Sequence, residues 1–503
     1  MWKDILLDVF RPLYIVAALL LSVYSFYLLA LTILFWWQRL TKKTIAPPVA
    51  GTVEDVNLPV VAIQIPLYNE SRVAVRVIDA AAQMDYPPQK LHIQILDDST
   101  DATEAIVAER VQYWQGLGIW ITCHHRDNRQ DFKAGALKEG MQHTPADLLA
   151  IFDADFVPPS VWLRQAVQPY LQPDATRLGF VQTRWTHIND DYSLSTQAQA
   201  LGLDGVFGVE HPVCTHYGLF KFMNGTGMLL RRQAIEDAGG WQGEVLVEDM
   251  DLCLRMQLRG WTATYLRDVT APAELPGLMA SYKIQQFRWA KGSMQVARRL
   301  AGPIARSHLP FWTKAHVLVR MLSYLVCPLI LLTLCLALPL YSWSGLWLDR
   351  LPFQYLSFAG LGFPLFFLSA QMTLYPRKQW WKVLMRLPLL SMMGLGMAAN
   401  NTLAVWEGLT LKKSVFQRTP KFGIGKQDRI QLRTIPVQMR LSPTHWLELL
   451  IAAYALLAAL ISVWGGNRVA GFFFVAYIVG FAWVAGAELV ENLAARRHGM
   501  KLP

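Results

Sequence analysis

The uneven placement of apolar residues constrains the fold of this chain more than any other feature of its sequence. Long apolar runs lie near the start and again after residue 300, whereas short β-rich runs alternate with polar segments between about 55 and 300. A run of about 20 apolar residues is long enough to cross a bilayer as a helix. Charged residues make up only 17% of the chain, against about 25% in an ordinary soluble domain. We therefore expect membrane-spanning helices around one water-exposed α/β domain.

The first apolar run, from about 13 to 37, predicts a membrane anchor that is retained in the mature protein. It is too long for the core of a signal peptide, and no small-residue cleavage site follows it. Further spans are expected at about 316–342, 354–375, 444–464 and 469–490. The stretch 383–399 is ambiguous, because it is short and soon reaches Asn400, Asn401 and Glu407. It either crosses the bilayer or lies in the interface.

Basic residues flank the apolar runs, which is the pattern of cytoplasmic loops. They are Arg39, Lys42, Lys43, Arg377, Lys378, Lys412, Lys413, Arg496 and Arg497. If 383–399 is interfacial, five spans place the α/β domain, the basic segment 412–440 and the C-terminus in the cytoplasm. A spanning 383–399 would place 412–440 outside, so we favour five spans. The sequence thus predicts an integral protein of the cell (inner) membrane with its N-terminus outside.

Charge and cysteine content exclude other classes of protein. The net charge is +10, but no basic stripe is interleaved with aromatic residues, so no nucleic-acid partner is expected. The five cysteines form neither a CxxC motif nor a paired framework, so we expect reduced thiols. The sequence also lacks the P-loop, the nucleophile elbow, the HExxH zinc motif and a GxGxxG after a strand.

Short β-rich runs predict the sheet of the central domain. The runs are 60–65, 91–96, 119–123, 148–152 and 178–183. Because helix-length segments separate them, they predict a mainly parallel sheet with helices on both faces. Ligands bind at the carboxyl ends of the strands in such sheets. Acidic and other polar side chains follow several of these ends, so we expect the chemistry at that edge.

The first two runs end in polar clusters. Tyr68, Asn69 and Glu70 follow the first run. A ring, an amide and a carboxylate suit a nucleobase or ribose, although the same residues suit an ordinary helix cap. Asp97 and Asp98 follow the second run, and such adjacent acids repel each other unless a cationic or hydrogen-bonding group lies nearby.

The fourth run delivers two carboxylates, Asp153 and Asp155. Residues two apart at a strand end point the same way, so both can reach one ion. Ligands that are all oxygens suit Mg²⁺ or Mn²⁺ holding a substrate diphosphate. An Asp-x-Asp pattern is common by chance, but its place after a buried strand favours a metal site.

Two predicted helices carry further candidates. Glu248 and Asp249 begin the first of them, where the helix dipole stabilises negative charge. They are either a plain N-terminal acid cluster or the source of a general base. Gln285, Arg288 and Trp289 lie in an amphipathic segment just before the membrane. One face of that helix suits lipid headgroups, while the other offers a guanidinium for phosphate and an indole for a sugar ring.

These motifs occur together in one known family. The stretches YNE, DDSTD, AIFDADF, NGTGMLLRR, VEDMDL and QQFRW appear in that order. Together they make the chain resemble a membrane-embedded, inverting family 2 glycosyltransferase of the cellulose synthase superfamily. The resemblance is strongest to the cellulose synthase-like A and C groups, which make β-1,4 mannan, glucomannan or glucan backbones. It covers residues from about 59 to 300.

The resemblance implies a fold and a division of the chain. The fold is a glycosyltransferase A-type, Rossmann-like α/β domain with a mainly parallel sheet, combined with about five transmembrane helices and interfacial helices. We expect an N-terminal anchor over 1–45, a cytoplasmic glycosyltransferase domain over 55–300 that ends in an interfacial helix, and a membrane region over 301–503. A cytoplasmic gating-like loop is expected at about 412–440.

The resemblance also implies roles for single residues. Those implied to bind the nucleotide-sugar are Tyr68, Glu70, Asp97, Asp98, Lys133, Asp153, Gln285 and Arg288. Asp155, with Asp153, would hold Mg²⁺ or Mn²⁺. Asp249 would be the general base with Glu248 beside it, and Trp289 would stack under the acceptor sugar.

A later stretch, FQRTPK at 416–421, resembles the gating-loop pattern FxVTxK. Phe416, Thr419 and Lys421 match the pattern and are implied to contact the nucleotide. Arg418 departs from it, because the family has Val at that position. The contacts that this residue makes are therefore the uncertain part of the loop.

The activity implied is processive and inverting. The chain would polymerise hexose from GDP-mannose or UDP-glucose into a β-linked, in particular β-1,4-linked, polysaccharide and move it across the membrane. Its partners would be the donor, the growing polysaccharide, the lipid bilayer and an accessory export protein. An alternative is transfer of one sugar to a membrane lipid, as in ceramide glucosyltransferase-like enzymes. A transporter or scaffold that only binds nucleotide is a third hypothesis, disfavoured because it needs no such set of acids.

Overall fold

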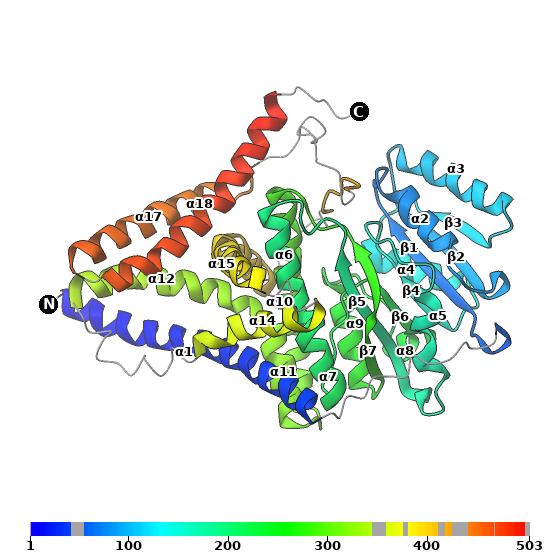
Figure 1. Ribbon diagram of the computed structural model, residues 1–503, viewed down its shortest axis with the longest axis horizontal. Coiled ribbons are helices and arrows are strands. Elements are labelled where there is room, and N and C mark those ends of the chain that lie inside the picture. Colours follow the sequence, from blue (N-terminus) through cyan, green and yellow to red (C-terminus); the bar gives the residue numbers. More distant parts are fainter. Residues whose placement is uncertain are drawn as a thin grey trace.

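The computed structural model describes residues 2–41, 55–344, 359–375, 381–410, 418–424, 441–466 and 468–497. An α/β domain lies on one side and a group of long helices on the other (Figure 1). Helix α10 (Met279–Arg306) lies between the two parts. This arrangement brings the helix that carries Gln285, Arg288 and Trp289 next to both the sheet and the apolar helices.

Seven strands form one sheet in the order β3-β2-β1-β4-β6-β5-β7. They are β1 (Val61–Leu67), β2 (Leu91–Asp97), β3 (Ile121–His125), β4 (Leu148–Ile151), β5 (Leu178–His187), β6 (Met228–Arg231) and β7 (Thr262–Ala273). β1 pairs in parallel with β2 and β4, β2 with β3, and β5 with β7, whereas β6 is antiparallel to both neighbours. The sheet is therefore mainly parallel, as predicted.

Helices cover both faces of this sheet, because successive side chains of a strand point to opposite faces. Val61, Ile63 and Ile65 of β1 pack into one core, and Ala62 packs into the other. The first core includes residues of α2 (Ala74–Ala82), α3 (Thr103–Gly116) and α5 (Trp162–Ala166). The second includes residues of α4 (Phe132–Gln142), α8 (Arg232–Asp237) and α9 (Glu248–Leu258). Each fully buried isoleucine contributes about 1.5–3 kcal/mol to such a core.

A set of connecting helices joins the sheet to the apolar helices. They are α6 (Leu194–Gly205), the π-helical turn η5 (Val206–Glu210), α7 (His211–Tyr217), α10 and α11 (Phe311–Met321). Val296 of α10 and Val317 of α11 are fully buried in the same core as the second face of the sheet. One apolar core therefore continues from the sheet into α10 and α11.

Within the part of the chain that the structure describes, four helices are long and apolar enough to cross a membrane. They are α1 (Trp2–Leu40), α12 (Val326–Ser344), α17 (His445–Trp464) and α18 (Arg468–Arg497). They correspond to four of the five spans predicted from the sequence, and they mark the chain as a membrane protein. The fifth prediction, 354–375, coincides with α14 (Gly362–Leu374). This helix is about 20 Å long, which is short of a hydrocarbon core of about 30 Å.

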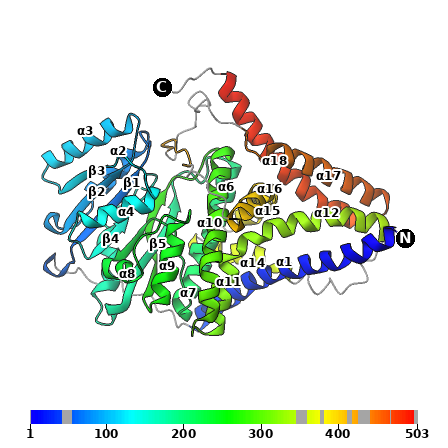
Figure 2. The same ribbon diagram turned by 180° about the vertical axis from the view of Figure 1, so that it is seen from behind.

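The ambiguous stretch forms two helices, α15 (Trp381–Gly396) and α16 (Ala398–Leu409). α15 is about 24 Å long and is not among the helices with the length of a span. α15 packs between α18 and α6, and α16 packs between α10 and α12; both lie beside the connecting helices in Figure 2. This placement agrees with an interfacial stretch, which stays a prediction.

Candidate active site

A cleft of about 1250 Å³, counted to its open mouth, lies at the carboxyl ends of β1, β2 and β4. The predicted site residues that line it are Tyr68, Glu70, Asp98, Lys133, Asp153, Asp155, Glu248, Asp249, Gln285, Arg288, Trp289, Thr419 and Lys421. Residues from seven separate stretches of the sequence therefore meet in one cleft.

Two predicted residues are not in this lining. Asp97 is buried beneath the cleft, where its Oδ1 accepts a hydrogen bond from the Ser99 N–H at 3.0 Å and its Oδ2 lies 3.5 Å from His125 Nδ1. It shapes the turn after β2 and does not face the ligand space. Phe416 lies outside the described residues.

The parallel register brings the polar strand ends together. Leu67 lies beside Asp97, and Asp97 lies beside His125. The loops after β1 and β2 are then joined by Asn69, which adopts a positive φ of 53°. Its N–H donates to Ser99 Oγ at 2.9 Å, and its Oδ1 accepts from the Thr100 N–H at 2.8 Å. Asn69 thus stabilises the contact between the two loops, while its two neighbours, Tyr68 and Glu70, line the cleft.

Two arginines that sequence reasoning missed organise one end of the cleft. Arg126 donates two hydrogen bonds to Asp98, at 2.7 and 2.6 Å, and both side chains are buried. The Arg129 guanidinium lies 3.3 Å from the centre of the Tyr68 ring. Such a cation–π contact fixes the ring plane. The only sequence signal was the position of both arginines directly after β3, because their partners lie on other strands.

Glu70 is a buried carboxyl group with a cationic neighbour. Burial raises the pKa of Glu70 to about 7, although Arg418 lies near enough to oppose this shift. Arg418 NH1 is 3.7 Å from Glu70 Oε1. The residue at which the loop motif departs from the family pattern therefore faces one of the predicted nucleoside-binding residues.

The Asp153 and Asp155 carboxylates each face a lysine across the cleft. Lys133 Nζ lies 2.5 Å from Asp153 Oδ1, and Lys421 Nζ forms an ion pair with Asp155 Oδ2. Burial alone would lower the pKa of Lys133, but Asp153 and then Glu248 outweigh it and raise that pKa. Two carboxylates that attract cationic groups into one cleft are a donor set that fits Mg²⁺ or Mn²⁺.

Asp249 lies at the start of α9, in the wall of the cleft. Burial, reinforced by Glu248 and opposed by Lys133, raises the pKa of Asp249 to about 7. Its Oδ1 accepts a hydrogen bond from the Met250 N–H at 2.8 Å. Gly225 faces the other oxygen, since a Cβ at this position would lie 3.1 Å from Asp249 Oδ2, and its φ of +81° also favours glycine. A carboxyl group with a pKa near neutrality suits general-base chemistry.

A second cavity adjoins the first on the side of the apolar helices. The residues that line both cavities are Trp185, Leu203, Asn224, Val247, Asp249, Gln285 and Trp289. The second cavity extends to Tyr282, Gln286 and Tyr324. Tyr324 belongs to the turn that opens the candidate span Ser323–Leu340. A polar and aromatic path therefore leads from Asp249 to the membrane region.

The segment 418–424 crosses the cleft and is held there by Glu274. The N–H groups of Phe422 and Ile424 donate to its two carboxylate oxygens at 2.9 and 3.1 Å, and Arg76 lies 3.1 Å from one of them. Glu274 is almost fully buried. Sequence reasoning missed this residue, because its partners lie about 150 positions later in the chain and only its place directly after a strand could have drawn attention to it.

Comparison with known proteins identifies the class to which this fold and cleft belong. Residues 59–292 match the family model described as glycosyltransferase like family 2. The resemblance to cellulose synthase-like glycosyltransferases, predicted from the motifs, is confirmed by the curated relatives of the chain.

These relatives come from plants. The probable glucomannan 4-beta-mannosyltransferase 4 of Oryza sativa subsp. japonica is 39% identical over 298 residues, which are 58% of this chain and 54% of the relative. Glucomannan 4-beta-mannosyltransferase 2 of Arabidopsis thaliana is 38% identical over 290 residues, 56% of this chain and 54% of the relative. The matches thus span about half the length of these relatives.

A solved structure of a mannosyltransferase is similar at a lower level. The enzyme PcManGT from Pyrobaculum calidifontis, in complex with GDP-Man and Mn²⁺, is 20% identical, with a TM-score of 0.49. The likeness covers 78% of this chain and 100% of that one. Similarity at this level says nothing about function.

Proposed function

We propose that the chain is a processive, inverting glycosyltransferase that extends a β-1,4-linked polysaccharide with mannose from GDP-mannose or glucose from UDP-glucose. The observation that carries this proposal is the position of Asp249 where two cavities meet. One cavity offers the groups that a nucleotide-sugar requires, and the other leads toward the membrane helices. The names of the curated relatives favour mannose as the transferred sugar.

The donor would lie across the carboxyl ends of the strands. Tyr68, Glu70 and Asp98 line the end of the cleft suited to a nucleoside, and Lys133 and Arg288 supply positive charge for its diphosphate. Asp153 and Asp155 would hold Mg²⁺ or Mn²⁺. When bound, the metal offsets negative charge on the diphosphate.

The reaction would be a single displacement with Asp249 as the base. Its carboxylate accepts the proton of the acceptor hydroxyl, and the hydroxyl oxygen forms the new bond to the anomeric carbon. The bond from that carbon to the diphosphate oxygen breaks, and the nucleoside diphosphate leaves with the electron pair. Arg288 stabilises the charge that develops on it. Attack from the side opposite the leaving group turns an α-linked donor into a β-linked product.

The acceptor chain would occupy the second cavity. Trp289 lies at the junction and offers an indole face to the terminal sugar, and Tyr282 and Tyr324 offer further aromatic surface deeper in the path. A product that grows by one sugar in each turnover would then be fed toward α12 and its neighbours. This arrangement requires the α/β domain and the C-terminus to face the cytoplasm, with an accessory export protein as a further partner.

The segment 418–424 would close over the bound donor. It carries Thr419 and Lys421, which line the cleft. Lys421 pairs with Asp155, and Arg418 lies near Glu70. A bound diphosphate with its metal would compete with this lysine for the Asp155 carboxylate, so donor binding and the position of the segment would be linked.

The decisive experiment supplies purified protein in nanodiscs with GDP-mannose, UDP-glucose, GDP-glucose or UDP-N-acetylglucosamine and Mg²⁺ or Mn²⁺. Released nucleoside diphosphate and product length are measured. A long β-linked polymer from one donor supports the proposal and names the sugar. A single-sugar lipid product would replace it with the glycolipid alternative.

Metal dependence is tested in the same assay. Excess EDTA is expected to stop turnover, and added Mn²⁺ or Mg²⁺ is expected to restore it. Full activity in EDTA would remove the proposed role of Asp155.

A further inference from the structure

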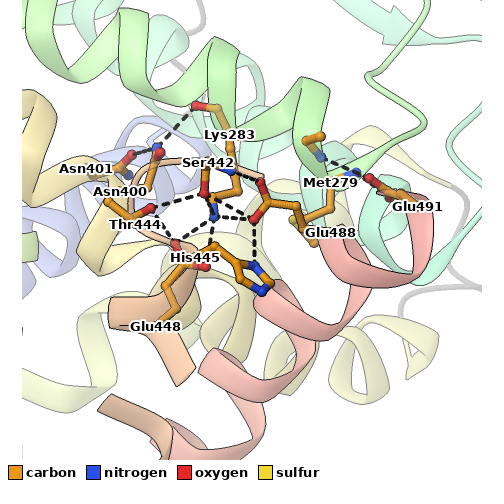
Figure 3. A network of polar contacts seen from close by, with 11 residues as sticks. Met279, Lys283, Asn400, Asn401, Ser442, Thr444, His445, Glu448, Glu488 and Glu491 are labelled. Carbon is orange, nitrogen blue, oxygen red and sulfur yellow. Dashed lines mark hydrogen bonds and ion pairs between the residues drawn. The ribbon is translucent and has the colours of Figure 1, made fainter. Parts of the chain in front are cut away.

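A buried group of charged side chains lies away from the cleft, where α10 meets the two C-terminal helices (Figure 3). Lys283 Nζ lies 2.7 Å from Glu448 Oε1, 2.9 Å from Glu488 Oε2 and 2.6 Å from Ser442 Oγ. The three charged side chains are at most 3% exposed. Removing one member of such a group leaves an uncompensated buried charge, which strongly destabilises the fold.

His445, Glu448 and Glu488 have the composition of a metal site, since their ligand atoms lie within 4.8 Å of one another. The Lys283 ammonium, however, already contacts both carboxylates. It occupies the place that a metal ion would need. The group is therefore an ionic joint between protein segments, with lysine as its cation.

Helices α10, α16, α17 and α18 all contribute to this joint. Glu448 belongs to α17 and Glu488 to α18. Asn400 of α16 donates a hydrogen bond to the Lys283 carbonyl at 3.1 Å. Ser442 lies just before α17, and its N–H donates to Glu488 Oε1 at 2.6 Å. The Ser442 hydroxyl also contacts the Lys283 ammonium, so Ser442 is tied to both charged groups.

The start of α10 is held by a second contact with α18. The N–H groups of Met279 and Ala280 donate to the Glu491 carboxylate at 2.7 and 3.1 Å. These N–H groups have no partner within the helix, because they belong to its first turn. A carboxylate from a membrane helix therefore caps α10, while its own N-cap residue, Leu278, makes no side-chain cap.

The geometry of a helix connects this joint to the cleft. Residues three and four apart share a face, so Gln285, Arg288 and Trp289 lie together, and all three line the cleft. Lys283 is two positions before Gln285 and points to the opposite side of the helix. The cluster therefore holds one face of α10, and the site residues lie on the opposite face of the same turns.

We propose that Lys283 is a positioning residue for the transfer reaction. It locks α10 to the α17–α18 pair and to Ser442, and so holds the site residues of α10 at the junction of the two cavities. This inference rests on the proposed function for its kinetic consequence. Its structural consequence, an ordered first turn of α10, is measurable without any substrate.

The test uses the full chain in nanodiscs and the variant Lys283→Met, which keeps most of the side-chain length and removes the charge. Amide hydrogen exchange is expected to increase at least about tenfold over 279–289 and to stay unchanged in β1 and β2. Turnover is expected to fall at least about tenfold, because the acceptor is misplaced by an α10 that is no longer fixed. Lys283→Arg, which keeps the charge, is expected to restore part of both properties.

Lys291→Met is the matched control. Lys291 lies on the same helix, is fully buried and pairs with Glu407 of α16 at 2.9 Å. Its loss removes a buried ion pair of the same kind without touching the α17–α18 pair. Exchange at 279–283 is expected to stay at the wild-type level in this variant. An equal increase in exchange at 279–283 in both variants would overturn the proposal. It would mean that losing any buried ion pair on α10 loosens its first turn.

A second variant covers the case in which Lys283→Met does not fold. The triple change Lys283→Met, Glu448→Gln and Glu488→Gln leaves no unpaired charge in the cluster, so it is expected to fold. Fast exchange at 279–289 with reduced turnover supports the positioning role. Wild-type exchange and turnover in the triple variant would overturn it. A wild-type chain that uses no nucleotide-sugar would refute the proposed function, while the exchange measurement would still decide the joint.

Discussion

At the scale of single residues, the carboxylates of the cleft differ in their contacts. Asp98 has both oxygens engaged by Arg126, and Asp153 is paired with Lys133. Asp249 is buried beside Glu248, and the pKa of its carboxyl group is raised to about 7. A group that ionises near neutrality both accepts and releases a proton readily. These contacts support Asp249 as the base.

Replacing Asp249 with Asn tests this role. Loss of a general base commonly lowers turnover by about 10²–10⁴-fold, and we expect a loss at the upper end of that range. The nucleoside diphosphate does not need the base, so its dissociation constant is expected to change less than about threefold. Equilibrium binding and turnover on the same preparation check both parts. Near-normal turnover would remove Asp249 from the mechanism.

The raised pKa of Asp249 also predicts how stability varies with pH. Between its ordinary value of 3.8 and about 7, the folded state keeps a proton that the unfolded state has released. The contribution of this group to the free energy of unfolding therefore falls as pH rises through that window and stays low above it. Asn at this position has no such loss. Asp249→Asn is expected to raise the melting temperature more at pH 8 than at pH 4, and an equal change at both values would contradict the buried-carboxyl explanation.

The same scale shows which residues the sequence identified and which it did not. Asp97 and Asp98 are adjacent at a strand end, so they point to opposite sides, and the sequence alone does not say which one faces the ligand. Arg126 and Glu274 were missed because their partners are distant in the sequence. Asp153, Asp155 and Asp249 were found because their position at strand or helix ends is itself visible in the pattern.

At the scale of elements, the five strands with clear β-rich runs were predicted, whereas β6 and β7 were not. β6 has only four residues, MLLR, which carry no periodicity. β7 contains charged residues and ends in APA, so it lacks a continuous apolar run. β7 is stabilised by its pairing with β5, which the amino-acid composition of β7 does not indicate.

The position of the segment 418–424 depends on one residue, Glu274, which accepts two of its backbone hydrogen bonds. In Glu274→Gln, one of the two oxygens becomes an NH₂ group that faces a backbone N–H donor, so the segment loses a hydrogen bond and gains a repulsion. We expect KM for the donor to rise about three- to tenfold with a smaller change in kcat. Arg76→Met removes only the third partner of Glu274 and is the control. Equal kinetics of Glu274→Gln and wild type would show that the segment is not held by this residue.

Close helix packing in the membrane region depends on two glycines. A Cβ on Gly480 of α18 would lie 2.4 Å from the Met392 carbonyl oxygen, and one on Gly396 of α15 would lie 2.2 Å from the Gly480 carbonyl oxygen. Small residues allow membrane helices to approach in this way. The two backbones therefore have no space for a side chain between them.

Gly480→Val is expected to separate α15 from α18 and to lower the melting temperature by several degrees, as a loss of about 1–3 kcal/mol does. Gly486→Ala on the same helix is the matched control, because nothing lies within 4 Å of a Cβ there. Thermal unfolding in one detergent compares the two. A stable Gly480→Val would mean that the helices repack without their present contact.

At the scale of the whole molecule, the apolar pattern predicted the division into an α/β domain and membrane helices, because length and hydropathy alone determine whether a helix can span a bilayer. It did not predict how the parts meet. The apolar core that continues from the sheet into α10 and α11 is made by residues with helical spacing that any amphipathic helix would show. The joint at Lys283 unites residues more than 150 positions apart.

Helix α1 has a consequence for the bilayer in which the molecule sits. Its apolar stretch of 35 residues is about 52 Å long, far more than the about 30 Å thickness of hydrocarbon. Near its end, Trp36 donates a hydrogen bond to Ser369 of α14, and Tyr27 contacts His316 of α11. These contacts fix the tilt of α1 relative to the rest of the protein. Because a fixed tilt matches only one hydrophobic thickness, we expect lipids with longer or shorter acyl chains to strain α1, which packs against α11 and α14.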